Sequence, residues 1–207
     1  MVHDPVDPSQ SEVMDLGSDL CLKCGICCRG VLHPDALLDE DERAMAERHE
    51  LTIASKDDGQ AVFGLPCNLH DHATNGCTIY DTRFHVCRRY ACDLLRKLRE
   101  GGVGLHEAQR LALSVRDRES GIYDRIGGYD PSRTIWQQIT SFLAADAADG
   151  LPSEVGRHAD LLVQARMLSM LCHRHFEYRM HKRLNAGAPR HLAAPPSDTS
   201  DADTNVP

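Results

Sequence analysis

The chain has 207 residues, 42% of them hydrophobic and 26% charged, which is enough for one domain with its own core. No run of about 18 apolar residues occurs, which excludes a membrane-spanning helix, and the acidic start of the chain lacks the features of a secretory signal. The formal net charge is −8. Residues 1–20 contribute −5 and 186–207 contribute −2, so the body of the chain is nearly neutral. The charge therefore gives no support for nucleic acid or a membrane surface as a partner.

Composition divides the chain into four segments. Residues 1–18 and 186–207 are polar or low in complexity, and we expect both to be disordered because they offer too little apolar surface to offset the entropy of ordering. Residues 19–100 form the expected cysteine-cluster module, and 101–185 form a helical region that packs on it. The sequence thus predicts a mostly α protein with a small cysteine-rich α+β metal-binding module and a helical C-terminal half.

Within the module, we expect a short helix, a strand and a hairpin. Asp39 and Glu42 have the spacing of a capping box and predict a short helix that begins there. A β-prone stretch over 61–65 leads to Cys67. Asn75-Gly76 predicts a tight turn before a short strand at 77–80.

Helical periodicity starts near residue 81 and continues through the rest of the chain. It predicts a helix that ends at residues 101–102, a second over 105–115, a third that begins at 130 and a fourth over 153–184. In the fourth helix, the side chains expected to face the core are Leu162, Val163, Met167, Met170 and Leu171.

Eight of the nine cysteines fall between residues 21 and 92. They are Cys21, Cys24, Cys27, Cys28, Cys67, Cys77, Cys87 and Cys92. A dense cluster without a secretory signal indicates metal ligands in a cytoplasmic protein, because the cytosol keeps thiols reduced. We expect the ninth, Cys172, to be a bystander.

The first four cysteines follow the spacing CxxCxxCC, in which one tight turn can aim two thiolates at the same ion. If this block is helical, Cys21, Cys24 and Cys28 share a face and Cys27 lies off it. The other four cysteines are widely spaced and must converge through folding. Eight thiolates can form two four-cysteine sites, each suited to Zn²⁺ or to an iron–sulfur cluster, or one site with four spare cysteines. The spacing alone does not decide between these arrangements.

Cations and histidines flank the cysteines. Cations that could balance the thiolate charge, or be ordinary surface residues, are Lys23, Arg29, Arg83, Arg88 and Arg89. Histidines that could replace a cysteine as ligand are His70, His72 and His85. No Ser/His/Asp or Cys/His arrangement defines a catalytic site.

The runs CLKCGICC and CTIYDTRFHVCRRYAC, with Cys67 between them, resemble the YkgJ-type cysteine-cluster family, whose CxxCxxCC domain is associated with zinc or iron chelation. The resemblance covers residues 21–92 and implies that the eight clustered cysteines bind zinc or iron. The family usually has proline after the residue that matches Arg83, where this chain has Phe84. Because the family includes flagellin lysine N-methylases, the resemblance also allows an alternative, an iron–sulfur protein with a redox or group-transfer role.

Overall fold

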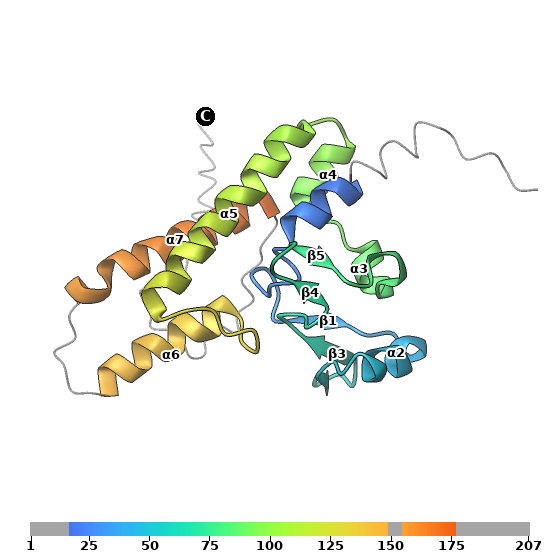
Figure 1. Cartoon of the computed structure of the whole chain (residues 1–207), viewed down its shortest axis with the longest axis horizontal. Helices are drawn as coiled ribbons and strands as arrows, with labels where there is room; N and C mark the ends of the chain where they lie inside the picture. Colours follow the sequence, from blue (N-terminus) through green and yellow to red (C-terminus); the bar gives the residue numbers. More distant parts are fainter. Residues whose placement is uncertain (1–16, 149–154, 177–207) are drawn as a thin grey trace, which may run out of the picture.

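The computed structural model describes residues 17–148 and 155–176. The expectation of disorder for 1–18 and 186–207 concerns residues outside the described ranges, apart from residues 17 and 18. The predicted first and last residues of the last helix, 153 and 184, also lie outside these ranges. The described part is mostly helical, with two small antiparallel sheets in its N-terminal region, which confirms the predicted fold class (Figure 1). None of the helices in these two ranges is long and apolar enough to cross a membrane.

The cysteine module begins with a helix whose described residues are 17–24 and contains both sheets. In the larger sheet, β3 (Ala61–Gly64) lies between β1 (Asp35–Leu37) and β2 (Ile53–Ser55) and is antiparallel to both. Between β1 and β2 run the 3-10 turn η1 (Glu40–Glu42) and the short helix α2 (Arg43–Arg48). The strand expected over 61–65 is therefore confirmed.

The smaller sheet is the hairpin predicted from the Asn75-Gly76 turn. Strand β4 (His70–Asp71) pairs with β5 (Gly76–Cys77), and residues 72–75 connect them. Asn75 has a positive φ of 59°, but Gly76 already belongs to β5, so the connection is a four-residue loop and not a two-residue Asn-Gly turn. The expected strand over 77–80 is shorter than predicted, because the 3-10 turn η2 (Tyr80–Thr82) follows β5 almost at once.

Phe84, the residue that departs from the family pattern, anchors a small core under the larger sheet. Its backbone angles are φ −51° and ψ 151°, close to the φ of about −65° that a proline ring imposes. Its ring is 2% exposed and lies 5.0 Å from the ring of Phe63. The chain thus keeps the turn a proline would favour and gains a buried aromatic side chain.

In the part of the chain that the structure describes, five α-helices follow the hairpin. They are α3 (His85–Arg89), α4 (Asp93–Arg99), α5 (Leu105–Ile126), α6 (Ile135–Ala148) and α7 (Val155–Phe176). The long helix α5 packs against α4, α6 and α7, and α4 also touches α7 (Figure 1). The module joins this layer through α4 and the helical residues 17–24.

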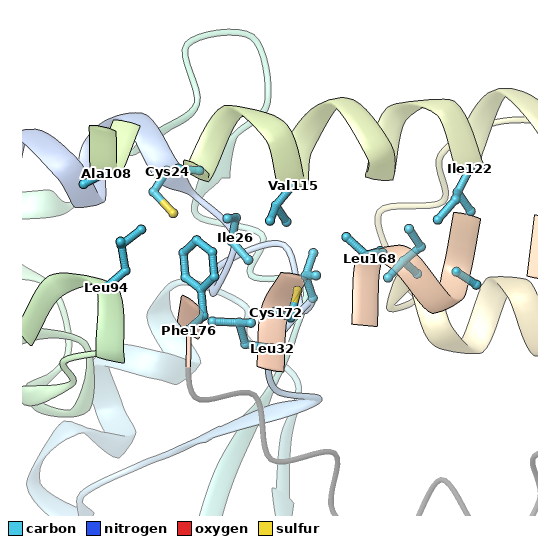
Figure 2. Close-up of a cluster of buried hydrophobic side chains, with 14 of the residues drawn as sticks. Cys24, Ile26, Leu32, Leu94, Ala108, Val115, Ile122, Leu168, Cys172 and Phe176 are labelled. Carbon is cyan, nitrogen blue, oxygen red and sulfur yellow. The ribbon is translucent and has the colours of Figure 1, made fainter. Parts of the chain in front are cut away.

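One apolar core runs through both halves of the described chain. Cys24 and Ile26 of the module lie beside Val115 of α5 and Phe176 of α7 in the same cluster (Figure 2). Trp136 of α6 adds a polar contact, because its Nε1–H donates to the carbonyl oxygen of Val31 at 2.9 Å. The cysteine module is therefore packed on the helices.

Two predicted helix starts are wrong in detail. Helix α6 begins at Ile135 because the Asp130 side chain accepts from the Ser132 amide and forms a local turn instead. Thr134 caps α6: its Oγ1 accepts from the Gln137 amide at 3.2 Å, and Gln137 Oε1 accepts from the Thr134 amide at 2.8 Å.

The predicted capping box at Asp39 and Glu42 does not form, since neither carboxylate caps a helix. Both turn toward His85. The Asp39 carboxylate lies 3.1 Å from the His85 ring, and Glu42 Oε1 accepts from the His85 amide at 2.7 Å. These acids thus tie the η1 segment to the start of α3.

The buried face predicted for the last helix is also wrong. Val163, Met167 and Met170 are 53%, 39% and 57% exposed, and Leu162 and Leu171 are only half-buried. The face that packs is made of Leu161, Ala165, Leu168, Cys172 and Phe176. These residues repeat at helical spacing, and the small side chains at 165 and 172 allow α7 to lie close against α5.

Candidate metal centre

The CxxCxxCC run straddles the end of a helix. Cys21 and Cys24 lie in the helical residues 17–24, and Gly25 ends the helix with a φ of 63°. A Cβ atom on Gly25 would lie 2.6 Å from both Asn75 Oδ1 and His70 Nε2, so glycine is required there on two grounds. Cys27 and Cys28 therefore lie in the turn beyond the helix, and the expectation of one helical face shared by Cys21, Cys24 and Cys28 is wrong.

Folding brings the four widely spaced cysteines back to this turn. The Cys67 amide donates to the Cys28 carbonyl oxygen at 2.7 Å, which holds the two backbones together. Cys77 lies in β5, opposite His70. Cys87 lies in α3, and Cys92 caps α4 by accepting from the Leu95 amide on its Sγ at 3.4 Å.

None of the nine cysteines forms a disulfide. Burial raises the pKa of the Cys24 and Cys28 thiols far above their usual range, and neighbouring thiolates raise it further. Burial, followed by the charges of Cys67 and Cys77, raises the pKa of Cys87 to about 12. Such thiols hold their protons until a cation replaces them, so metal binding would release protons.

The charges that act on each thiol identify its neighbours. The charges of Cys92 and Cys24 raise the pKa of Cys27 more than the charge of Cys28 does, although Cys28 is next to it in the chain. The pKa of Cys28 is raised more by the charges of Cys67, Cys87 and Cys77 than by the charge of Cys24. Charges of cysteines from both blocks therefore act on the two adjacent thiols of the CxxCxxCC run. Among the described residues, no three His, Cys, Asp or Glu side chains are arranged to hold a metal ion, so the thiols would have to close onto one.

Of the five candidate cations, Arg83 is placed to balance the charge of two cysteines of the cluster. It acts on the pKa of both Cys21 and Cys87, lowering each against the larger effect of burial. Its guanidinium lies 3.8 Å from the centroid of the Tyr80 ring and donates to the Tyr80 carbonyl oxygen at 2.9 Å, which fixes its position.

Arg29 and Arg88 have carboxylate partners. Arg29 Nε donates to Glu119 Oε2 at 2.8 Å, and Arg88 faces Glu42 at 3.8 Å. The Glu119 pair is buried, so Arg29 is committed to a carboxylate even though it follows Cys28 directly. For Lys23 and Arg89, a role beside the thiolates stays a prediction.

The three candidate histidines lie in different surroundings. His85 pairs with Asp39 and is half-exposed. His72 lies between Arg29, at 3.3 Å, and the Tyr129 hydroxyl, at 2.6 Å. His70 is only 6% exposed, beside Asn75, and neither of its ring nitrogens makes a hydrogen bond of good geometry.

A buried polar network behind the cysteines was missed by sequence reasoning. Glu119 is fully buried in α5 and accepts from Arg29 and, at 3.0 Å, from the Tyr123 hydroxyl. The sequence did contain a signal: Glu119 lies in the same helical register as Val115 and Ile122, both of which are buried. A charged residue in a core register predicts a buried partner.

The donor set agrees with the family comparison. Residues 20–107 match the model of the CxxCxxCC family, described as a "Putative zinc- or iron-chelating domain". The match covers most of the cysteine module and less than half of the chain, and it makes this region similar to the CxxCxxCC domain. Neither the curated proteins nor the solved structures contain a match to the chain. Thiolates are soft ligands that suit zinc and iron alike, so the residues present fit either metal.

Proposed function

We propose that this protein chelates zinc or iron through its eight clustered cysteines. One observation carries the proposal: two cysteine blocks that are distant in sequence converge in one module, and none of their thiols is joined in a disulfide. A cysteine that only fills space in a core does not need other cysteines nearby, whereas a metal site needs several thiolates around one point.

The module has a physical reason to bind metal. Its sheets consist of strands of two to four residues, and its second core centres on a few side chains around Phe63 and Phe84. Such a segment buries little apolar surface, and thiolate–metal bonds supply folding free energy that it otherwise lacks. The main effect of the metal would thus be to stabilise the folded module.

A reducing compartment suits this role. We place the protein in the cytoplasm, because thiols remain free to bind metal there and are not drawn into disulfides. The partner that the site supports is a metal ion. When bound, zinc would supply a closed structural centre, whereas an iron–sulfur cluster would supply an electron-transfer group.

The experiment is metal and acid-labile sulfide analysis of protein purified without oxygen, together with its visible spectrum. Stoichiometric zinc or iron supports chelation. Zinc without sulfide identifies the chelating form, and iron with equal sulfide identifies the iron–sulfur alternative. Protein that holds neither metal under these conditions, and takes up neither on reconstitution, overturns the proposal.

A matched set of variants tests the ligands. Cys24→Ser and Cys77→Ser should each lower the metal content. Cys172→Ala removes the ninth thiol, which is fully buried between the helices, and should leave the metal content unchanged at a cost of about 1 kcal/mol in stability. Equal metal content in all three variants would show that the clustered cysteines are not the ligands.

A further inference from the structure

We propose that the cysteines divide into two four-thiolate metal sites whose ligands interleave along the chain. Site A consists of Cys21, Cys24, Cys27 and Cys92, and site B consists of Cys28, Cys67, Cys77 and Cys87. This proposal rests on the metal-chelating function proposed above and assigns each ligand within it. Each site then takes one tetrahedral ion or one cluster of the kind that four thiolates hold.

Packing separates the two sets. Cys24, Cys27 and Cys92 all belong to or contact the main core beside α4 and α5. Cys67 packs instead against the small core of Phe63 and Phe84. Three cysteines of site A and one of site B therefore pack on different cores.

The backbone around site B shows how its ligands come together. The hydrogen bond from the Cys67 amide to the Cys28 carbonyl oxygen joins the first two members. The His70 amide then donates to the Cys67 carbonyl oxygen at 3.0 Å, and His70 is paired across the hairpin with Cys77. The hairpin thus brings Cys77 back to Cys67. Cys87 follows Val86, whose side chain packs against the same small core as Cys67.

Site A is assembled from the helix end and the start of α4. Cys21 and Cys24 are three residues apart in one helix and so lie on the same side of it. Cys27 and Cys92 both pack against the main core, to which Cys24 belongs. Since Cys92 is fixed as the cap of α4, it completes the set from outside the CxxCxxCC run.

The adjacent residues Cys27 and Cys28 are the point where the sites part. After Gly25, Cys27 packs against the same main core as Cys92, whereas the carbonyl oxygen of Cys28 accepts from the Cys67 amide. In two-cluster ferredoxins, likewise, the fourth cysteine of a compact run serves the other cluster. A division by sequence block would instead place all four cysteines of the run on one ion.

Double variants distinguish the two divisions. The probe is Co²⁺ added to full-length, metal-stripped protein without oxygen, with bound ions counted by elemental analysis and tetrahedral thiolate ligation read from the visible absorption. The wild type should bind two ions. Cys27→Ser with Cys92→Ser should lose one ion, as should Cys28→Ser with Cys87→Ser. Cys87→Ser with Cys92→Ser should lose both.

If instead the four cysteines of the CxxCxxCC run hold one ion and the other four hold the second, the results are reversed. The Cys87→Ser, Cys92→Ser variant would then retain one ion, and the Cys27→Ser, Cys92→Ser variant would retain none. That result, or a wild type that binds a single ion, overturns the division while leaving chelation intact. A wild type that binds no ion overturns both proposals. Far-UV circular dichroism of each variant reports whether it has folded.

A second measurement needs no variant. Metal-stripped wild-type protein is titrated with Zn²⁺ and alkylated briefly at each step. Mass spectrometry then gives the protection of each cysteine from alkylation. Protection should rise together within the set of site A and within the set of site B as zinc is titrated. Correlated protection of Cys27 with Cys28, and of Cys87 with Cys92, would overturn the division.

Discussion

Arg29 donates from its Nε to Oε2 of Glu119 at 2.8 Å, across 90 positions in the chain. Arg29 follows Cys28 directly, and Glu119 lies in the middle of α5, so this ion pair joins the cysteine module to the helical half. The Arg29 side chain is 11% exposed and that of Glu119 is fully buried. Charges removed from water to this extent depend on each other.

The first prediction concerns the loss of one partner of this pair. Glu119→Ala leaves the Arg29 charge buried without its carboxylate, and should lower the free energy of unfolding by about 3–5 kcal/mol. The measurement is urea denaturation at a fixed, saturating metal concentration. The control is Asp117→Ala, an exposed acid on the same helix, with an expected change within about 0.5 kcal/mol.

Replacing both partners tests whether the charge itself is the cause. Arg29→Met combined with Glu119→Leu removes both charges and fills the space, so it should recover much of the stability lost in Glu119→Ala. Equal stability of Glu119→Ala and Asp117→Ala would contradict a structural role for the pair.

The second prediction is a pH dependence from His72. Burial, and next the charge of Arg29, lower the pKa of His72 below its ordinary value of 6.5. The unfolded chain thus takes up a proton near pH 6.5 that the folded protein accepts only at lower pH. The free energy of unfolding therefore falls as the pH drops through this range.

His72→Gln removes that proton uptake, so the variant should lose less stability than the wild type between about pH 7.5 and pH 5.5. Denaturation of both proteins at the two pH values gives the comparison. Because both carry the same thiols, any loss of metal in acid cancels in the difference. Parallel decline of the two proteins would show that His72 does not cause the acid sensitivity.

The third prediction tests which face of α7 is buried. Leu168 is fully buried and Met170 is 57% exposed, although both are large apolar residues on one helix. Leu168→Ala should lower the free energy of unfolding by about 2–5 kcal/mol, and Met170→Ala by about 0.5 kcal/mol or less. Thermal or urea denaturation measures both. Similar losses in the two variants would contradict the observed packing.

This helix shows why periodicity predicts the presence of a helix better than its orientation. Apolar residues occupy most positions from 161 to 172, so a period of 3.6 residues is satisfied by more than one face. The face that packs contains Ala165 and Cys172, which are small enough for close approach to α5. That preference depends on the shape of the partner helix, which the sequence of α7 alone does not contain.

The candidate site divides in the same way between local and long-range information. The CxxCxxCC run, the strand at 61–64 and the hairpin around Asn75-Gly76 are local signals, and each was predicted from the sequence. Which thiols become neighbours depends on the hairpin that returns Cys77 to Cys67 and on the capping position of Cys92. The partners of Glu119 are likewise set by packing between elements far apart in the chain.

The fourth prediction concerns metal removal and uses the single tryptophan of the chain. Trp136 Nε1 donates to the Val31 carbonyl oxygen at 2.9 Å, and Val31 lies three residues after Cys28. Since metal binding is expected to fix this segment, a chelator should loosen it and expose the indole to water. The emission maximum should then move to longer wavelength and return when Zn²⁺ is restored.

Two controls make the fluorescence change specific. Trp136→Phe should abolish the signal, and Cys172→Ala should give the same reversible shift as the wild type, because Cys172 is not one of the eight proposed ligands. Chelator that strips the metal, as judged by elemental analysis, without moving the emission maximum would show that the segment after Cys28 is held by packing alone. The core contacts of Val31, which is fully buried, would then suffice to fix it.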